Sequence, residues 1–234
     1  MTEPVSPLLP LLSWQHLSLH AAFTTRPLLT NLTGEVRSGE ILAVMGPSGS
    51  GKSTLLTLLN RMRSATSGSI VMQGKPLSSY PIPQLRRQIA YLPQQAVLFP
   101  GTVADNLTVG CRLWQIPCDV PGWLAHVDLD PAIAEQSAST LSGGQAQRLA
   151  LARTLALEPT VLLLDEPTSA LDGPTALDIE RLIQNWVAAK ERAVIWVTHD
   201  PHQAERIASR LLRIEAGQQA FLGKPGDTWG GTRS

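Results

Sequence analysis

The sequence predicts an α/β fold with a mostly parallel central sheet, and two observations carry this prediction. Three short apolar runs, at residues 41–45, 161–164 and 193–197, contain no alternating polar positions. Uninterrupted apolar runs of this length are typical of strands buried on both faces, as in parallel sheets. Segments with helical periodicity lie between and after the runs, and such an alternation of strands and helices characterises α/β proteins.

Polar residues follow each run and predict one shared site. The first run leads into the glycine-rich segment 46–54, the second into Asp165 and Glu166, and the third into segment 198–200 with His199. In open α/β sheets, ligands bind at the carboxyl ends of the strands. We therefore expect these three segments to lie together around one ligand.

Helices are expected around the strands because apolar residues recur there at helical spacing, with Pro at first-turn positions. The predicted helices cover residues 52–62, 142–157, 174–189 and 201–209. A strand–turn–strand unit is predicted at 211–214 and 219–222, and residues 223–234 read as a loose tail because they are rich in turn-forming residues.

Residues 94–138 interrupt the alternation of strands and helices. They hold several prolines, two of the six tryptophans and both cysteines. We expect a small helical insertion there, with helices at 103–109, 122–126 and 131–136.

The composition is that of a globular protein in a reducing compartment. Of the 234 residues, 43% are apolar and 16% are charged, and 19 basic residues balance 19 acidic ones. No net charge therefore attracts the chain to nucleic acid or to an anionic membrane. Cys111 and Cys118 are too few for a disulfide scaffold. No secretory signal or membrane-spanning run of roughly 20 apolar residues is recognised, so we expect another protein to hold the chain at any membrane.

The segment after the first run has the spacing Gly-x-x-x-x-Gly-Lys-Ser of a P-loop. Its glycines let backbone N–H groups surround phosphate oxygens, and the following helix adds its positive end. Lys52 is expected to reach the β- and γ-phosphates, and the Ser53 hydroxyl to bind Mg²⁺. The expected phosphate-binding residues are Gly46, Pro47, Ser48, Gly49, Ser50, Gly51, Lys52, Ser53 and Thr54.

Two adjacent carboxylates follow the second run. Asp165, at the end of the expected strand, is predicted to hold Mg²⁺ directly or through water. Glu166 can orient and deprotonate a water that attacks a bound nucleotide. Buried strands often end in Asp, so this pair is informative because a P-loop lies in the same chain.

A second anion site is predicted at residues 141–145, Leu-Ser-Gly-Gly-Gln. Ser142 and Gln145 have the spacing of a capping box, which indicates the start of a helix. A plain cap does not require Gly143 and Gly144, since glycine is unfavourable inside a helix. The two glycines leave the N–H groups of the first turn uncovered, so that an anion can approach them.

With these motifs in this order, the chain resembles the ATP-binding subunit of ABC transporters over about residues 12–222. The Walker A segment, the Leu-Ser-Gly-Gly-Gln signature, the Walker B strand with Glu166, the D-loop at 169–172 and His199 have the family's order and spacing. The resemblance implies one ABC ATPase domain. Its RecA-like P-loop core would cover about 12–93 and 157–222, with an antiparallel β portion, and a helical subdomain would cover about 94–156.

The resemblance also implies the roles of individual residues. Gln94 matches the Q-loop glutamine, which contacts Mg²⁺ or the attacking water, and His199 matches the histidine that contacts the γ-phosphate. Two family subunits pack head to tail, so Ser142 and its glycines would bind ATP held by the other subunit's P-loop. Asp172 belongs to the D-loop that crosses this interface. The implied cofactors are ATP and Mg²⁺, with Ser53, Gln94 and Asp165 as metal ligands.

The family further implies two partners, a separate membrane-spanning permease and a second ATPase subunit, and a place at the cytoplasmic face of the inner membrane. No nucleic acid is expected. The Thr-Val-x-x-Asn form at 102–106, Trp114 and segment 193–200 are similar to Fet-type iron or metal exporters, although importer ATPases share the same core. Phe99 and Trp114 are candidate contacts with the permease, and burial in the domain core is the alternative for Trp114.

Several alternatives remain open at this point. The chain lacks the usual tyrosine that stacks on adenine, so Phe23, or else His20, is the candidate for that contact. Cys111 and Cys118 read as unpaired thiols rather than as a metal sensor. The alternative function is a soluble ABC-type ATPase acting on DNA or the ribosome, but the chain lacks the long insertions or tandem domains of those relatives. The signature motif disfavours a P-loop kinase.

Overall fold

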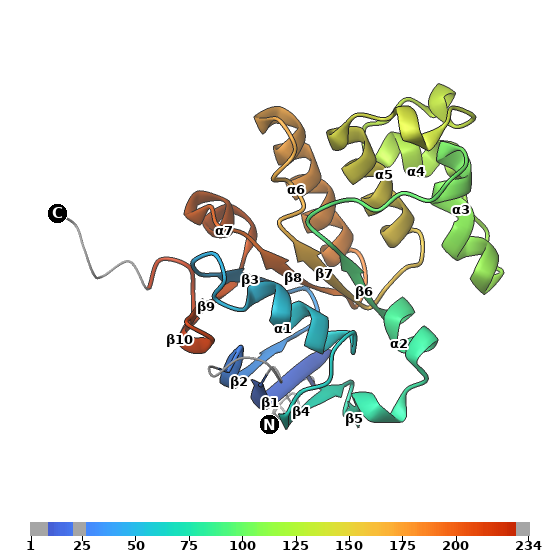
Figure 1. The fold of residues 1–234 in the computed structure, drawn as a ribbon. Helices are drawn as coiled ribbons and strands as arrows, with labels where there is room; N and C mark the ends of the chain where they lie inside the picture. The colour runs from blue at the N-terminus through green and yellow to red at the C-terminus, as the bar shows by residue number, and fades with distance from the viewer. Residues whose placement is uncertain (1–8, 21–26, 228–234) are drawn as a thin grey trace, which may run out of the picture.

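One mixed β-sheet organises the computed structural model, which describes residues 9–20 and 27–227 (Figure 1). Within these residues the strands lie in the order β5-β4-β1-β2-β10-β9-β3-β8-β7-β6. The adjacent strands β9, β3, β8, β7 and β6 run parallel to one another. Strands β1, β2, β4 and β5 form an antiparallel portion. The strands are β1 (Leu12–Leu19), β2 (Leu29–Val36), β3 (Ile41–Met45), β4 (Ser67–Met72), β5 (Lys75–Pro76), β6 (Ile89–Leu92), β7 (Val161–Asp165), β8 (Ala193–Val197), β9 (Arg210–Glu215) and β10 (Gln218–Gly223).

The predicted α/β class with a mostly parallel sheet and an antiparallel portion is confirmed. The three apolar runs form the adjacent strands β3, β8 and β7, and every residue of these strands is buried. Alternate residues of β7 face opposite sides, because Leu163 packs with the helix at 52–59 and Leu164 with the helix at 173–188. Burial on both faces explains why the runs contain no alternating polar residue.

Helices cover both faces of the sheet, and a group of three lies to one side, beyond β6 (Figure 1). Leucines of α1 pack on one face together with residues of β3, β7 and β8, while α6 packs on the other. Helices α3, α4 and α5 share a hydrophobic core with that second face. The helices are α1 (Lys52–Leu59), α2 (Ile82–Gln88), α3 (Val103–Trp114), α4 (Val120–His126), α5 (Gly143–Leu155), α6 (Gly173–Ala188) and α7 (Pro201–Ile207). None of the helices in the described ranges is both long and apolar enough to span a bilayer.

The prediction for the insertion was partly wrong. A helix was expected at 131–136, but the structure has only a short 3-10 turn, Pro131–Ile133. The carbonyls of Ala134 and Gln136 instead accept hydrogen bonds from the first N–H groups of α3, at Ala104 and Val103. These carbonyls therefore satisfy the open start of a neighbouring helix. The N–H groups of Ile133, Ala134 and Gln136 bond carbonyls three residues earlier, so the segment forms 3-10 turns rather than an α-helix.

The helix expected at 103–109 continues to Trp114, because Gly110 does not end it. A β-carbon at Gly110 would lie 2.8 Å from the side chain of Leu157, so the glycine serves close packing.

Helix α1, in contrast, is shorter than the predicted helix at 52–62. Arg61 adopts the left-handed conformation directly after Asn60, the residue that caps the helix.

Candidate functional site

The segment between β3 and α1 folds back around the side chain of Lys52. The Lys52 Nζ donates to the carbonyls of Gly46, at 2.8 Å, and Pro47, at 2.9 Å, and the residue is 8% exposed. Glycine is required at position 46, where φ is +148° and a β-carbon would overlap the Ile214 carbonyl. The loop therefore holds a buried ammonium group at the first turn of α1, where the helix N-terminus favours anions.

A cavity of about 630 Å³ lies along this loop. One wall comes from Gly49 to Thr54, and the other comes from the start of β2 and the turn between β9 and β10. That turn is tied to the loop, since the Gly217 N–H donates to the Ser50 carbonyl at 3.1 Å. Of the predicted phosphate-binding residues, Ser50 and Lys52 are buried, Gly46, Gly51 and Thr54 are half-buried, and Pro47, Ser48, Gly49 and Ser53 are exposed.

A carboxylate cluster lies at the carboxyl ends of β7 and β8. The Gln94 Nε2 donates to Glu166 Oε2 at 3.0 Å, and the His199 Nδ1 lies 3.4 Å from the same oxygen. His199 also lines a cavity of about 340 Å³ together with Gly46, Pro47 and Ser48. The three segments expected at the strand ends thus lie together in space.

Asp165 and Glu166 occupy different environments although they are adjacent. Asp165 is 5% exposed, and its Oδ2 accepts a hydrogen bond of 3.1 Å from the Tyr91 hydroxyl. Burial, and secondly the negative charge of Asp165, raises the pKa of Tyr91, so this hydroxyl stays a donor at neutral pH. The role of Tyr91 was not predicted from the sequence, because a tyrosine inside a short apolar strand carries no distinctive signal.

Glu166 has an unusual backbone conformation for a non-glycine residue, with φ at +48°. Its N–H donates to the Val197 carbonyl at 3.1 Å, and its carbonyl accepts from the Ser169 N–H and hydroxyl. A left-handed residue is maintained only where its surroundings compensate, and such residues cluster at functional sites. The chain turns sharply after Asp165 and presents the Glu166 carboxylate to Gln94 and His199.

The predicted capping box at the start of α5 is present. The Gln145 N–H donates to Ser142 Oγ at 3.3 Å, and the Ser142 N–H donates to Gln145 Oε1 at 2.9 Å. A β-carbon at Gly143 would meet nothing within 4 Å, whereas one at Gly144 would press on Leu171 at 3.2 Å. Gly143 therefore serves no packing purpose among the described residues, and it leaves the helix N-terminus open to an external group.

The remaining predicted residues have other positions. Asp172 is the N-cap of α6 and accepts from the Thr175 N–H, a hydrogen bond that lowers the pKa of Asp172. Phe23 lies outside the described residues, and His20 is exposed at the end of β1. Trp114 is half-buried, with the Arg87 guanidinium 5.1 Å from its ring centre, so it is neither fully exposed nor a core residue.

The two cysteines are free thiols, with Cys111 buried and Cys118 half-buried. Burial, followed by the neighbouring Cys111, raises the pKa of Cys118 to about 12. A thiol with this pKa stays protonated at neutral pH and is a poor metal ligand. Over residues 9–20 and 27–227, no group of three or more His, Cys, Asp or Glu residues has the arrangement of a metal site.

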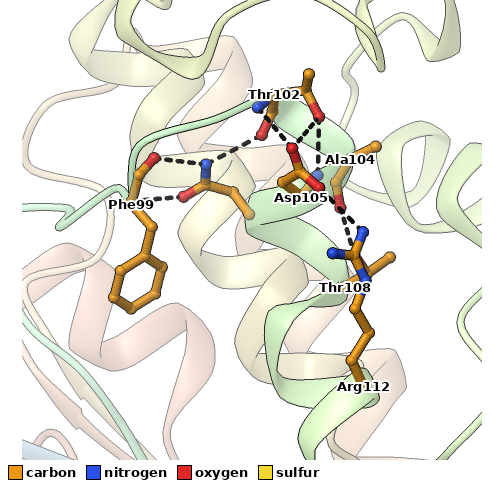
Figure 2. Close-up of polar contacts among 7 residues, drawn as sticks. Phe99, Thr102, Ala104, Asp105, Thr108 and Arg112 are labelled. Atoms are coloured by element: carbon orange, nitrogen blue, oxygen red, sulfur yellow. Dashed lines mark hydrogen bonds and ion pairs between the residues drawn. The ribbon is translucent and has the colours of Figure 1, made fainter.

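The segment that follows Gln94 is anchored by a buried asparagine. Asn106 is fully buried, and its side chain bonds the Phe99 N–H at 2.7 Å, the Phe99 carbonyl at 2.9 Å and the Thr102 carbonyl at 3.0 Å. Figure 2 shows the neighbouring capping box, in which Thr102 and Asp105 bond each other at the start of α3. These contacts fix the chain path between Gln94 and α3, with Phe99 half exposed.

We predict that Asn106→Ala lowers the free energy of unfolding by about 1–3 kcal/mol, because the Phe99 N–H loses its partner. Urea unfolding followed by circular dichroism measures the change. Arg112→Ala is the control, since it breaks an exposed ion pair with Asp105 on the same helix and should change stability little. Equal losses in the two variants would contradict the role given to Asn106.

The fold and site together define a P-loop nucleoside triphosphatase. The ABC transporter family model matches residues 29–169. The Bacillus subtilis protein YjkB, named as an ABC transporter ATP-binding protein, is 47% identical over 195 residues, covering 83% of this chain and 78% of YjkB. The chain belongs to the ABC transporter ATP-binding family, and it is an ATP-binding ATPase.

Further relatives show the range of the family. The Fe(3+) ions import ATP-binding protein FbpC 1 of Rhodococcus jostii is 38% identical over 207 residues, covering 87% of this chain and 60% of FbpC 1. The structure is also similar to that of the ATP-binding cassette MJ0796, a dimer in a post-hydrolysis state bound to ADP and Pi. The TM-score is 0.82 at 26% identity, and the match covers 91% of this chain and 98% of MJ0796.

Proposed function

We propose that this chain hydrolyses MgATP at a head-to-tail interface between two ATPase subunits and thereby drives transport through a separate membrane-spanning permease. The observation that carries the proposal is the Glu166 carboxylate, held between Gln94 at 3.0 Å and His199 at 3.4 Å beside the P-loop. A carboxylate fixed by two polar side chains is suited to take a proton from a water that attacks the γ-phosphate.

The P-loop supplies the binding of the phosphates in this proposal. Lys52 exchanges its hydrogen bonds with the Gly46 and Pro47 carbonyls for bonds to the β- and γ-phosphates. The N–H groups of segment 46–54 surround the phosphate oxygens. The proposed stacking contact with adenine is Phe23 or else His20, and Phe23 lies outside the described residues. His199 and Gln94 orient the attacking water and the γ-phosphate relative to Glu166, which takes the proton.

Ser53, Gln94 and Asp165 fit Mg²⁺, because the donor set is made of hard oxygen atoms. Ser53 is exposed in the first turn of α1, and the Tyr91 hydroxyl orients the Asp165 carboxylate. When bound, Mg²⁺ would neutralise charge that develops on the phosphate oxygens.

The start of α5 is the proposed contact with ATP held by a second subunit. Gly143 has open space where a side chain would stand, and the Ser142 hydroxyl is exposed beside the helix N-terminus. Such a site suits the γ-phosphate. The dimeric structure of the similar protein MJ0796 supports a paired arrangement. Gly144, Gln145 and Asp172 would lie along the same interface.

The finer proposal concerns cargo and place. We propose that the chain drives export of a metal ion, of which iron is the first candidate. We also propose that the subunit is bound at the cytoplasmic face of the inner membrane. Support comes from the resemblance of segments 102–106 and 193–200 to Fet-type exporters. FbpC 1, a relative named for import of Fe(3+) ions, shares the same core, so the direction depends on the permease.

Co-purification tests the transporter proposal. The tagged Glu166→Gln chain is expressed, membranes are solubilised in mild detergent with ATP present, and co-purifying proteins are identified by mass spectrometry. We expect to recover a polytopic membrane protein, and we expect its recovery to require a chain that binds ATP. The Lys52→Ala chain is the control. Recovery only from the soluble fraction together with ribosomes or DNA would overturn the transporter proposal in favour of a soluble ABC-type ATPase acting on DNA or the ribosome.

A further inference from the structure

A buried carboxylate lies outside the ATP site, on α6. Glu180 is 3% exposed, and its oxygens accept hydrogen bonds from Gln203 Nε2 at 2.8 Å and from Arg206 Nη2 at 2.9 Å and Nε at 3.1 Å. The hydrogen bonds to Glu180 raise the pKa of Arg206. Because a buried charge is costly unless it is paired and hydrogen-bonded, this arrangement holds Gln203 firmly against α6.

The second N–H of the Gln203 amide reaches the loop that follows β7. Gln203 Nε2 donates to Thr168 Oγ1 at 2.9 Å, and Gln203 itself is 7% exposed. Thr168 is two residues after Glu166, and Gln203 is four residues after His199. One side chain therefore joins the loop that carries Glu166 to the helix that follows His199.

The sheet alone fixes the two loops only at their starts. Asp165 pairs with Val197 in the β7–β8 register, and the Glu166 N–H bonds the Val197 carbonyl. The Thr198 N–H still bonds the Val44 carbonyl of β3 at 3.2 Å. Beyond Thr198 and Glu166 the chain leaves the sheet on both strands, and Gln203 supplies a side-chain tie between the two exits. His199 and Glu166, 3.4 Å apart, therefore lie between two fixed points, the paired ends of β7 and β8 and the Gln203–Thr168 hydrogen bond.

We infer that Gln203 is a positioning residue for ATP hydrolysis, which holds Thr168 and thereby sets Glu166 relative to His199. The inference rests on the proposed role of Glu166. Gln203 touches neither of these two side chains, and Glu180 with Arg206 serves as its anchor. Small displacements of reacting groups lower turnover strongly. The phosphate-binding loop is not part of this link, so ATP binding should not depend on it.

The test removes each partner of the hydrogen bond with little change in shape. In the full chain, Gln203→Leu and Thr168→Val are each expected to lower kcat for ATP about tenfold to a hundredfold, with the Kd for ATP unchanged. Thr168→Ser keeps the hydroxyl and should retain kcat within about twofold. The double variant should lose no more than the single variants, because both remove the same link.

Gln184→Leu is the matched control. The Gln184 Nε2 also bonds across α6 and α7, to the Arg206 carbonyl at 3.0 Å, but it has no link to Thr168. This variant should keep normal kcat. An equal loss of kcat in Gln184→Leu would overturn the inference, since the effect would then be general packing of the two helices. Wild-type kcat in Thr168→Val would overturn it as well, and this variant leaves Glu180 intact if Gln203→Leu fails to fold.

Glu166→Gln, assayed in parallel, separates the inference from the proposed function. If Glu166→Gln stops turnover and Gln203→Leu and Thr168→Val do not lower it, the inference fails and the proposed function stands. If Glu166→Gln keeps turnover, the proposed role of Glu166 as the base fails, and the positioning role of Gln203 fails with it.

Discussion

Glu166→Gln is expected to lower ATP turnover by about 10²–10⁴-fold while leaving ATP binding intact. The amide keeps the size of the side chain and can still contact Gln94 and His199, but it cannot accept the proton of the attacking water. Turnover is measured by phosphate release, and binding by equilibrium dialysis with ATP. A variant that hydrolyses ATP at the wild-type rate would remove Glu166 as the base.

Glu158→Gln is the matched control for this substitution. Glu158 precedes β7, at the opposite edge of the sheet from Glu166, and pairs with the exposed Lys190 at 3.0 Å. The same loss of one carboxylate there should leave turnover unchanged. A comparable loss of turnover in the control would indicate a general effect of charge rather than proton transfer at Glu166.

The Glu166→Gln chain should also accumulate as an ATP-bound dimer, since the step that separates the subunits is blocked. Light scattering with and without ATP measures this. Adding Ser142→Arg to the same chain should abolish the dimer without weakening ATP binding, because a large cation would fill the open space at the start of α5. An intact ATP-bound dimer in this double variant would refute the contact across the interface.

The sequence predicts the parts of the fold that depend on local patterns. The strands β3, β7 and β8 are evident because burial on both faces requires uninterrupted apolar residues. The start of α5 is evident because Ser142 caps it with its side chain, and the start of α6 is evident because Pro174 lies in its first turn. The approach of Glu166 and His199 to the P-loop also follows from the sequence, since parallel strands end at the same edge of the sheet. Gln94 is expected there only from the family resemblance.

Long-range contacts explain what the sequence does not predict. The residues at 131–136 have a reasonable helical pattern, but they form only 3-10 turns, and two of their carbonyls bond the first turn of α3. The helix predicted at 103–109 stops before Gly110, yet the real helix runs through this glycine, which packs against Leu157, 47 positions away in the chain. Gln203 and Tyr91 acquire their roles from Thr168 and Asp165, and no local spacing connects either pair.

Lys52→Ala is expected to weaken MgATP binding by at least about a hundredfold. The ammonium group is buried at the start of α1 and has only the Gly46 and Pro47 carbonyls as partners in the described part of the chain. Charge-assisted hydrogen bonds to phosphate contribute about 1.5–3 kcal/mol each, and each 1.4 kcal/mol is a tenfold change in affinity. Fluorescence titration with a labelled ATP analogue measures the Kd directly.

The substitution also removes the apolar stem of Lys52, so a loss of affinity has two sources, the lost ammonium group with its hydrogen bonds and the lost packing of the stem. Lys52→Met separates them, because it retains most of the apolar stem and lacks only the charge and the donors. If charge on the phosphates dominates, both variants lose affinity equally; a much smaller loss in Lys52→Met would assign the effect to the stem's packing. Lys190→Ala, at the far edge of the sheet, removes one exposed lysine and should leave the Kd unchanged. Unchanged affinity in Lys52→Ala itself would refute the phosphate-binding role of the loop, since among the described residues no other buried ammonium group lines the cavity along segment 49–54.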